Sequence, residues 1–123
     1  MPVQDQTCVF CAVAAGNAPA TVVREWEDVI AIRPRPCGVN DGHVLVIPRT
    51  HVADASVDPA VSGRVMTCAA ELMAEHEAAN IITSRGAAAT QTVFHLHIHV
   101  VPREEGDGLP LPWTPQQTAG GAR

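Results

Sequence analysis

Three histidines at alternate positions are the residues of this chain best suited to chemistry. His95, His97 and His99 alternate with apolar residues in the run 94–101. Side chains two apart on a β-strand point to the same face, so the pattern predicts a row of imidazoles on one face and core residues on the other. Imidazole has an unperturbed pKa near neutrality and acts as a nucleophile, an acid, a base or a metal ligand. The run therefore predicts a reactive strand that lies against the hydrophobic core.

The spacing of the three imidazoles leaves several kinds of site open. Same-face neighbours lie about 6.5–7 Å apart on a strand, so His95 and His99 are about 13 Å apart and a straight strand cannot offer all three to one metal ion. A metal could bind two neighbours, or His97 could attack a substrate with one imidazole on each side. A polar sheet face open to water is the third interpretation, which the apolar residue at every intervening position disfavours.

Two further motifs contain candidate ligands or catalysts. Cys8 and Cys11 form a C-x-x-C pair, which is found in redox-active thiols, in half of a zinc site, and without function. Zinc requires four ligands in tetrahedral geometry, so this pair needs two partners from elsewhere. His43 precedes the apolar run 44–47. By itself, a histidine in that place is more often the end of a strand than a catalyst.

The rest of the sequence predicts the elements that position these residues. The expected fold class is α+β, with a five-stranded antiparallel sheet, one long helix and a short N-terminal helix, because hairpin-like links join the strands. The long helix is expected to begin at a cap, Ser56 or Asp58, with Pro59 in its first turn, and to end near Ala79. We expect the short helix at 8–15, the strands at 21–26, 29–33, 43–48, 80–84 and 91–101, and tail anchors at Leu109, Leu111 and Trp113.

Length and composition bound the function. The chain has 123 residues, 46% of them hydrophobic and 17% charged, so we expect a single domain over 1–123 with flexible ends at 1–7 and 114–123. A net charge of −5 disfavours a nucleic-acid partner but not a small phosphorylated ligand. No apolar run could span a bilayer and no signal peptide is evident, so we expect a cytoplasmic protein with no membrane partner. Disulfides are not expected there, which makes Cys37 and Cys68 ordinary loop and helix residues.

Two segments together resemble a known family. Residues 42–48 read G-H-V-L-V-I-P and residues 91–99 read Q-T-V-F-H-L-H-I-H. The combination is similar to the histidine triad (HIT) superfamily of nucleotide hydrolases and transferases, and most to its bacterial, nucleoside phosphoramidase-like branch, over about residues 8–113. It implies a homodimer of α+β protomers in which the histidine strand lines a purine nucleotide pocket. The transferase branch usually ends the triad with Gln, so His99 favours hydrolysis.

The resemblance implies catalytic roles for four histidines. His97 would attack an α-phosphorus and carry a nucleotidyl intermediate, since imidazole is both a nucleophile and a good leaving group. The backbone carbonyl of His95 would hold the far nitrogen of His97 and fix its tautomer. His99 would contact the phosphate oxygens and stabilise the developing charge, and His43 would stand near the triad as a supporting imidazole.

The same resemblance implies that His97 and His99 contact the phosphate of the substrate. It implies further substrate contacts from Gln91, Thr92 and Ser84. Thr92 is expected to donate to the leaving group. Three positions depart from the family pattern: Ser84 stands where an Asn is usual, Thr90 where a Gly is common, and Arg35 where an acidic residue grips the ribose hydroxyls. These changes leave the chemistry at phosphorus intact and imply altered ribose binding.

Several bacterial members resemble this chain in pairing an N-terminal C-x-x-C with two histidines. The matching residues here are Cys8, Cys11, His51 and His95. The resemblance implies that they hold a structural zinc ion, which would tie the N-terminus to the sheet and leave His97 free. No organic cofactor is expected.

These observations predict a hydrolase of nucleoside phosphoramidates or dinucleoside polyphosphates that acts through a covalent intermediate on His97. Two alternatives stay open. The chain could be a nucleotide-binding dimer without catalytic activity, which the departures at Ser84 and Arg35 favour. It could also be a metal-dependent enzyme in which His97 and a neighbouring triad histidine bind the ion.

Overall fold

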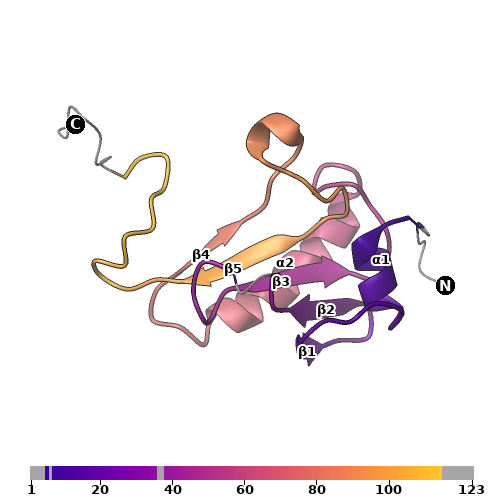
Figure 1. The fold of residues 1–123 in the computed structure, drawn as a ribbon, viewed down its shortest axis with the longest axis horizontal. Helices are drawn as coiled ribbons and strands as arrows, with labels where there is room; N and C mark the ends of the chain where they lie inside the picture. The colour runs from indigo at the N-terminus through magenta and orange to yellow at the C-terminus, as the bar shows by residue number, and fades with distance from the viewer. Residues whose placement is uncertain (1–4, 6, 36–37, 115–123) are drawn as a thin grey trace.

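The computed structural model describes residues 5, 7–35 and 38–114. It confirms the predicted α+β class, with one long helix, one short helix and a five-stranded antiparallel sheet (Figure 1). The elements are α1 (Val9–Ala14), β1 (Val22–Glu25), β2 (Val29–Ile32), β3 (Val44–Pro48), α2 (Pro59–Met73), β4 (Ala79–Ile82), a 3-10 turn η1 (Ala87–Ala89) and β5 (Ile98–Pro102).

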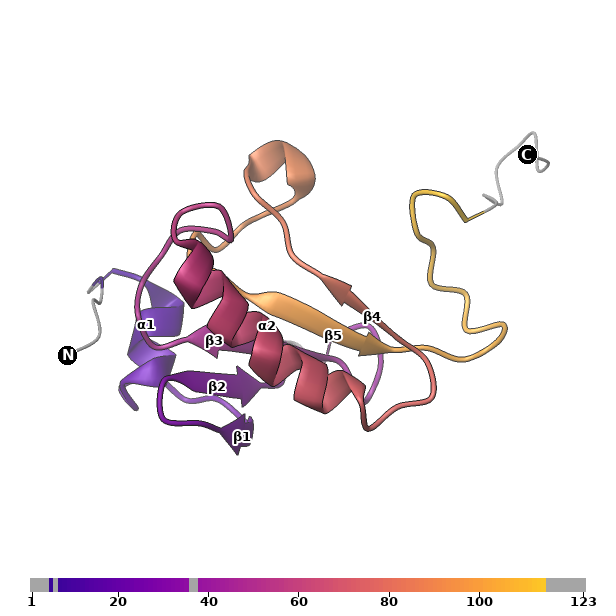
Figure 2. The same ribbon diagram turned by 180° about the vertical axis from the view of Figure 1, so that it is seen from behind.

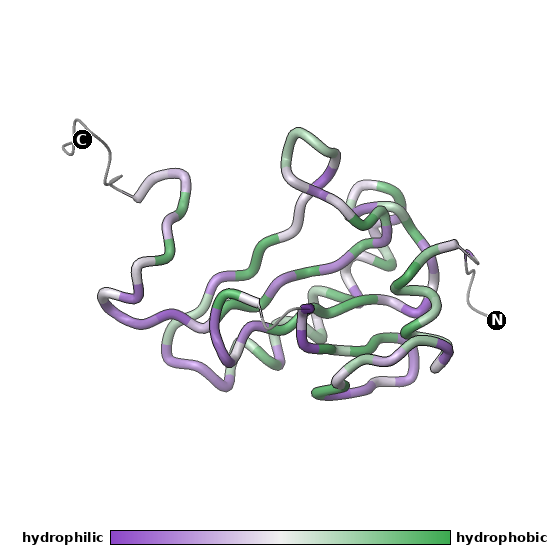
Figure 3. The backbone as a smooth tube through the Cα atoms, viewed as in Figure 1, coloured by the Kyte–Doolittle hydropathy of each residue, from purple (hydrophilic) through white to green (hydrophobic). Residues whose placement is uncertain are grey.

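The two helices lie on opposite faces of the sheet, whose strand order is β1-β2-β3-β5-β4. Helix α2 crosses the rear face, as Figure 2 shows, and α1 lies on the front face near one end of β3. Strands β2 and β3 are buried throughout because each face carries its own apolar cluster, and hydrophobic segments mark these strands in Figure 3. Strand β5, which contains His99, pairs with the buried β3, so the triad segment lies next to the centre of the sheet.

Helix α2 begins as predicted but ends earlier. Asp58 is its N-cap, accepting from the backbone N–H of Ala60 at 3.0 Å, and Pro59 follows in the first turn. Ser56 instead donates to Asp54. The helix ends at Met73 rather than near 79, because residues 79–82 pair with β5 and need a connection after the helix. Pairing in the sheet overrides the apolar periodicity that extends past the helix end.

Strand β5 is shorter than the predicted strand 91–101. Its pairing with β3 reaches only as far as Ile98 opposite Val46, and the N–H of Leu96 donates to Val52 instead of to the ladder. Alternation of faces nevertheless continues upstream of the strand, because Leu96 packs in the core under α2. Phe94 departs from it: its side chain is 51% exposed, so the prediction that it packs on the apolar face is wrong.

The tail after β5 follows the predicted anchors only in part. Leu109 and Leu111 are half-buried, but Trp113 is 74% exposed. Of the predicted flexible ends, residues 1–4, 6 and 115–123 lie outside the described residues, as does Cys37. Cys68 lies buried on α2, as expected. None of the helices within the described ranges has the length and hydropathy to cross a membrane.

Candidate active site and metal centre

The three triad histidines lie in a continuous row on the α1 face. His95 is fully buried, whereas His97 and His99 are half-buried. The ring centroids of His97 and His99 are 5.2 Å apart. Phe10 of α1 contacts the rings of both His95 and His97 edge-on, with centroids 5.9 and 5.2 Å away. Helix α1 therefore packs directly against the middle imidazole through Phe10.

The backbone fixes which nitrogen of His97 is free. Its Nδ1 lies 2.8 Å from the carbonyl oxygen of His95, the contact that the family resemblance implies. A carbonyl oxygen can only accept, so Nδ1 of His97 carries the proton and Nε2 carries the lone pair. A neutral imidazole with its lone pair on Nε2 is the form required for attack on an electrophile. This segment lies just before β5, where Thr83 also donates to the carbonyl of His97 at 2.8 Å.

A second chain of hydrogen bonds fixes the tautomer of His99. The backbone N–H of Val39 donates to Nδ1 of His43 at 3.1 Å, so the neutral ring of His43 carries its proton on Nε2. That Nε2 lies 2.9 Å from Nδ1 of His99, which must therefore accept. His99 then carries its own proton on Nε2. Gly38 permits the close turn, because its φ is +74° and a Cβ there would lie 2.5 Å from Nδ1 of His43.

Burial keeps both imidazoles of this chain neutral. Desolvation lowers the pKa of His99 to about 4, with smaller contributions from the neighbouring imidazoles, and it lowers the pKa of His43 below its ordinary value. At neutral pH, His99 therefore offers an N–H donor without a full positive charge. A donor of this kind stabilises charge that develops on a phosphate oxygen.

The tautomer of His99 can be read directly by nitrogen NMR. Long-range ¹H–¹⁵N spectra of the wild type are expected to show His99 protonated on Nε2 alone from neutral pH down to near pH 4. A His43→Leu variant removes the donor to Nδ1 of His99, so both tautomers of His99 are expected. A His43→Gln variant restores an amide N–H at this place, so the single tautomer of His99 should return. The exposed His76 supplies the control as His76→Gln. A wild-type His99 protonated on Nδ1 would contradict the assignment.

Four residues from three segments form a compact metal-binding set. Within the described ranges, Cys8, Cys11, His51 and His95 place one donor atom each, all within 4.8 Å of one another. Nδ1 of His95 lies 3.3 and 3.5 Å from the two sulfurs, and 3.2 Å from Nδ1 of His51. A tetrahedral zinc site with ordinary bond lengths has S···N edges of about 3.5 Å and N···N edges of about 3.3 Å. The set fits zinc, and neither His97 nor His99 belongs to it.

The surroundings of this set favour metal ligation over a plain hydrogen-bonded cluster. Nε2 of His95 lies 2.8 Å from the carbonyl oxygen of Pro48, so it carries the proton and Nδ1 presents its lone pair to the sulfurs. Burial lowers the pKa of His95 to about 4, so the ring is neutral. Burial also raises the pKa of the Cys11 thiol, while the N–H of Asp5 donates to that sulfur. A bound cation would compensate a thiolate there.

The predicted substrate contacts lie in three different surroundings. Gln91 is buried, and its amide is bonded to the backbone of Gly86, Ala53 and Val93. It holds the loop before the triad, and direct substrate contact by Gln91 stays a prediction. Thr92 is exposed and lines a hollow beside the metal-binding set. Ser84 lines a different cavity, together with His43 and His99.

Two of the residues that depart from the family pattern, Thr90 and Arg35, lie in loops. Thr90 has a φ of +71°, a conformation that favours glycine and strains a β-branched residue, which explains why a Gly is common there. Arg35 is exposed on the loop after β2. Residue types carry no signal for the backbone partners of His43 and His95 at Val39 and Pro48, because every residue brings such backbone groups.

Comparison with known proteins supports the same family. A family model described as "HIT domain" matches residues 15–106. An uncharacterised HIT-like protein of Mycobacterium tuberculosis is 40% identical over 114 residues, which cover 83% of this chain and 75% of that protein. An adenylylsulfatase of Arabidopsis thaliana is 30% identical over 109 residues, which cover 83% of this chain and 55% of that protein.

A solved structure with the same fold carries a metal. The Zn-bound histidine triad family protein from Mycobacterium smegmatis aligns with a TM-score of 0.73 and 38% identity, covering 90% of this chain and 85% of that one. The four-residue set described above and this Zn-bound relative point to the same kind of metal centre.

Proposed function

Because the chain belongs to the HIT family, whose members bind nucleotides and include hydrolases, we propose that it is a nucleotidyl hydrolase acting on purine nucleotides through His97. The observation that carries this proposal is the hydrogen bond from Nδ1 of His97 to the carbonyl of His95, which leaves Nε2 with a lone pair in a half-buried site. A polar strand face without a function would not require that tautomer.

The proposed reaction has two displacements at the α-phosphorus. Nε2 of His97 attacks phosphorus, the bond from phosphorus to the leaving group breaks, and the leaving group departs with a proton to which Thr92 is the candidate donor. Water then attacks the nucleotidyl-histidine, the P–N bond to His97 breaks, a nucleoside monophosphate leaves, and the proton that the water loses restores the hydroxyl of Thr92. The Nε2–H of His99 stabilises the phosphate oxygens in both steps. His43 acts as a positioning residue because it sets the tautomer of His99.

The metal has a structural role in this proposal. Cys8, Cys11, His51 and His95 would hold zinc, which links the start of α1 to the segment before β5 and supplies folding free energy. The chemistry itself stays with His97. We also propose a single HIT domain that works in the cytoplasm as a homodimer, in keeping with the family resemblance.

The proposal is tested by release of adenosine monophosphate from three substrates: adenosine 5′-phosphoramidate, diadenosine tetraphosphate and adenylyl sulfate. The third is included because a relative is an adenylylsulfatase. We expect the protein to hydrolyse at least one of these substrates. Phosphorus NMR or chromatography measures the adenosine monophosphate released. Tight binding of adenosine monophosphate without turnover of any of the three would favour the non-catalytic alternative.

A further inference from the structure

Gln91 is a buried amide whose hydrogen bonds join three segments of the chain just before the triad. Its side chain is only 4% exposed. Its Nε2 donates to the carbonyl oxygens of Ala53 at 2.7 Å and Val93 at 3.1 Å, and its Oε1 accepts from the N–H of Gly86 at 2.8 Å. A primary amide has two N–H donors, so the protein already engages both of them. These three bonds are called the Gln91 clamp below.

The Gln91 clamp closes a strained loop at its base. Gln91 and Gly86 exchange two hydrogen bonds, because the backbone N–H of Gln91 also donates to the carbonyl of Gly86 at 3.1 Å. Between them, Thr90 has a φ of +71°, a conformation that a β-branched residue keeps only where its neighbours enforce it. Strain of this kind is concentrated at functional sites. The loop therefore depends on the clamp for its shape.

The same clamp fixes the backbone around Thr92. The bond to Val93 joins the amide of the residue before Thr92 to the carbonyl of the residue after it. Downstream, the N–H of Leu96 donates at 2.8 Å to the carbonyl of Val52, next to the first acceptor of the amide. Thr92 is exposed, and its hydroxyl has no hydrogen-bond partner among the described residues. The direction of this hydroxyl therefore follows from the backbone, through the χ1 preferences of a β-branched side chain.

We propose that Gln91 is a positioning residue that holds the hydroxyl of Thr92 where it can protonate the leaving group. The inference rests on the proposed function, in which Thr92 is the candidate donor. When an amine leaves, Nε2 of His97 bonds to phosphorus, the P–N bond to the amine breaks, and the hydroxyl proton of Thr92 moves to the departing nitrogen. A proton from the water that attacks later restores the hydroxyl. Gln91 itself exchanges no proton.

The test uses two substrates that differ in their need for a proton. The nitrogen of adenosine 5′-phosphoramidate needs a proton to leave as ammonia, whereas a p-nitrophenyl ester of adenosine monophosphate releases a stable anion. Gln91→Met keeps the length of the side chain and removes its hydrogen bonds. It should lower kcat/KM for the phosphoramidate at least about tenfold more than for the ester, because general acids contribute about 10²–10⁴-fold. Gln91→Glu keeps the acceptor for Gly86 and gives the same comparison if Gln91→Met does not fold.

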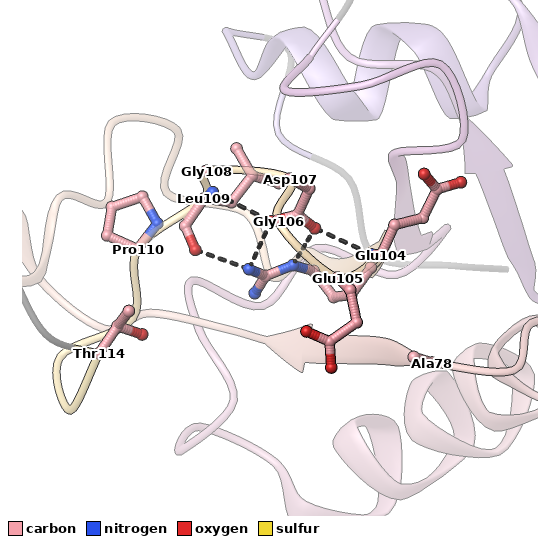
Figure 4. A pocket seen from close by; sticks show the side chains of 10 residues that line it. Ala78, Glu104, Glu105, Gly106, Asp107, Gly108, Leu109, Pro110 and Thr114 are labelled. Atoms are coloured by element: carbon pink, nitrogen blue, oxygen red, sulfur yellow. Dashed lines mark hydrogen bonds and ion pairs between the residues drawn. The ribbon is translucent and has the colours of Figure 1, made fainter.

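Two controls remove comparable hydrogen bonds elsewhere. Ser62→Ala removes a hydroxyl that donates at 2.6 Å to the carbonyl of Ala55, close to Ala53 in the chain. Asp107→Asn weakens the loop after β5, where Asp107 accepts from Arg103 at 2.8 and 2.9 Å (Figure 4). That loop bounds a hollow of about 760 Å³ whose described lining contains no histidine. Both variants should leave the ratio of the two kcat/KM values unchanged.

A double-mutant cycle shows whether Gln91 acts through Thr92. In a Thr92→Val background, Gln91→Met should no longer alter the ratio of the two kcat/KM values, because the donor is already absent. Equal losses for the two substrates, which direct contact of Gln91 with the phosphate would give, overturn the proposal. A change in the ratio that persists without the hydroxyl of Thr92 also overturns it.

A second measurement needs no turnover. Scalar couplings to the methyl carbon of Thr92 report its χ1 angle, and we expect one rotamer in the wild type and in Ser62→Ala but averaging in Gln91→Met. A Thr92 that is averaged in the wild type, or that does not respond to Gln91→Met, overturns the proposal. A wild type that hydrolyses neither substrate contradicts the hydrolase, whereas a single Thr92 rotamer that depends on Gln91 supports the clamp in that case as well.

Discussion

A His97→Gly variant is expected to lose at least about 10⁴-fold in turnover of whichever adenylyl substrate the wild type hydrolyses. Removing a nucleophile that forms a covalent intermediate abolishes the two-step path, and losses of this size are typical for such residues. Because His97 is half-buried and outside the metal-binding set, the variant should keep its fold. Steady-state release of adenosine monophosphate measures the loss, and circular dichroism checks the fold.

The matched control for this variant is His76→Gly, which removes an imidazole from an exposed position. It should retain wild-type turnover. If His97→Gly keeps turnover within a few-fold of the wild type while folded, the nucleophile has been assigned to the wrong residue.

Removal of the metal is expected to have the second large effect, on stability rather than on chemistry. Chelation, or replacement of Cys8 by Ser, should lower the melting temperature by about 10 °C or more, because a structural zinc contributes several kcal/mol to folding and about 1 kcal/mol moves the midpoint of a domain of this size by roughly 4 °C. Calorimetry with and without chelator measures the change, and elemental analysis should find one zinc per wild-type chain.

Cys68→Ala is the control for this experiment, because Cys68 is buried on α2 and is not part of the metal-binding set. Cys68→Ala can lower the melting temperature by itself, but the chelator should lower the melting temperature of this variant as much as that of the wild type. Two outcomes speak against a structural zinc: a purified protein without metal, or a chelator that stops turnover at a temperature where the melting curve shows the protein still folded. The second outcome would favour metal-dependent chemistry.

The sequence was most informative where side-chain type and position coincide. The apolar run 44–47 lies in the predicted strand 43–48, and β3 is buried on both faces between α1 and α2. The spacing of the triad predicted a shared face, and that face is retained although β5 begins only at Ile98. The four metal-site residues were assigned by resemblance, and they meet because a loop after β3 carries His51 to the start of α1.

What the sequence did not provide lies mostly in the backbone. The N–H of Val39 and the carbonyl of Pro48 set the tautomers of His43 and His95, and neither group has a signature in residue type. The loop 103–109 also depends on long-range pairing, since Arg103 reaches Asn80 across the chain as well as Asp107 nearby. Contacts of this kind require the folded arrangement before they can be inferred.

The proposed hydrolysis requires that Nε2 of His97 forms a bond to phosphorus during turnover. Rapid acid-free quenching of the wild type with a substrate that it hydrolyses, followed by intact and peptide mass spectrometry, tests it most directly. We expect a mass increase of one nucleotidyl group on the peptide that contains residues 91–103, located at His97 and absent from His97→Gly. Efficient turnover with the adduct on another residue, or with none at any quench time, would contradict it.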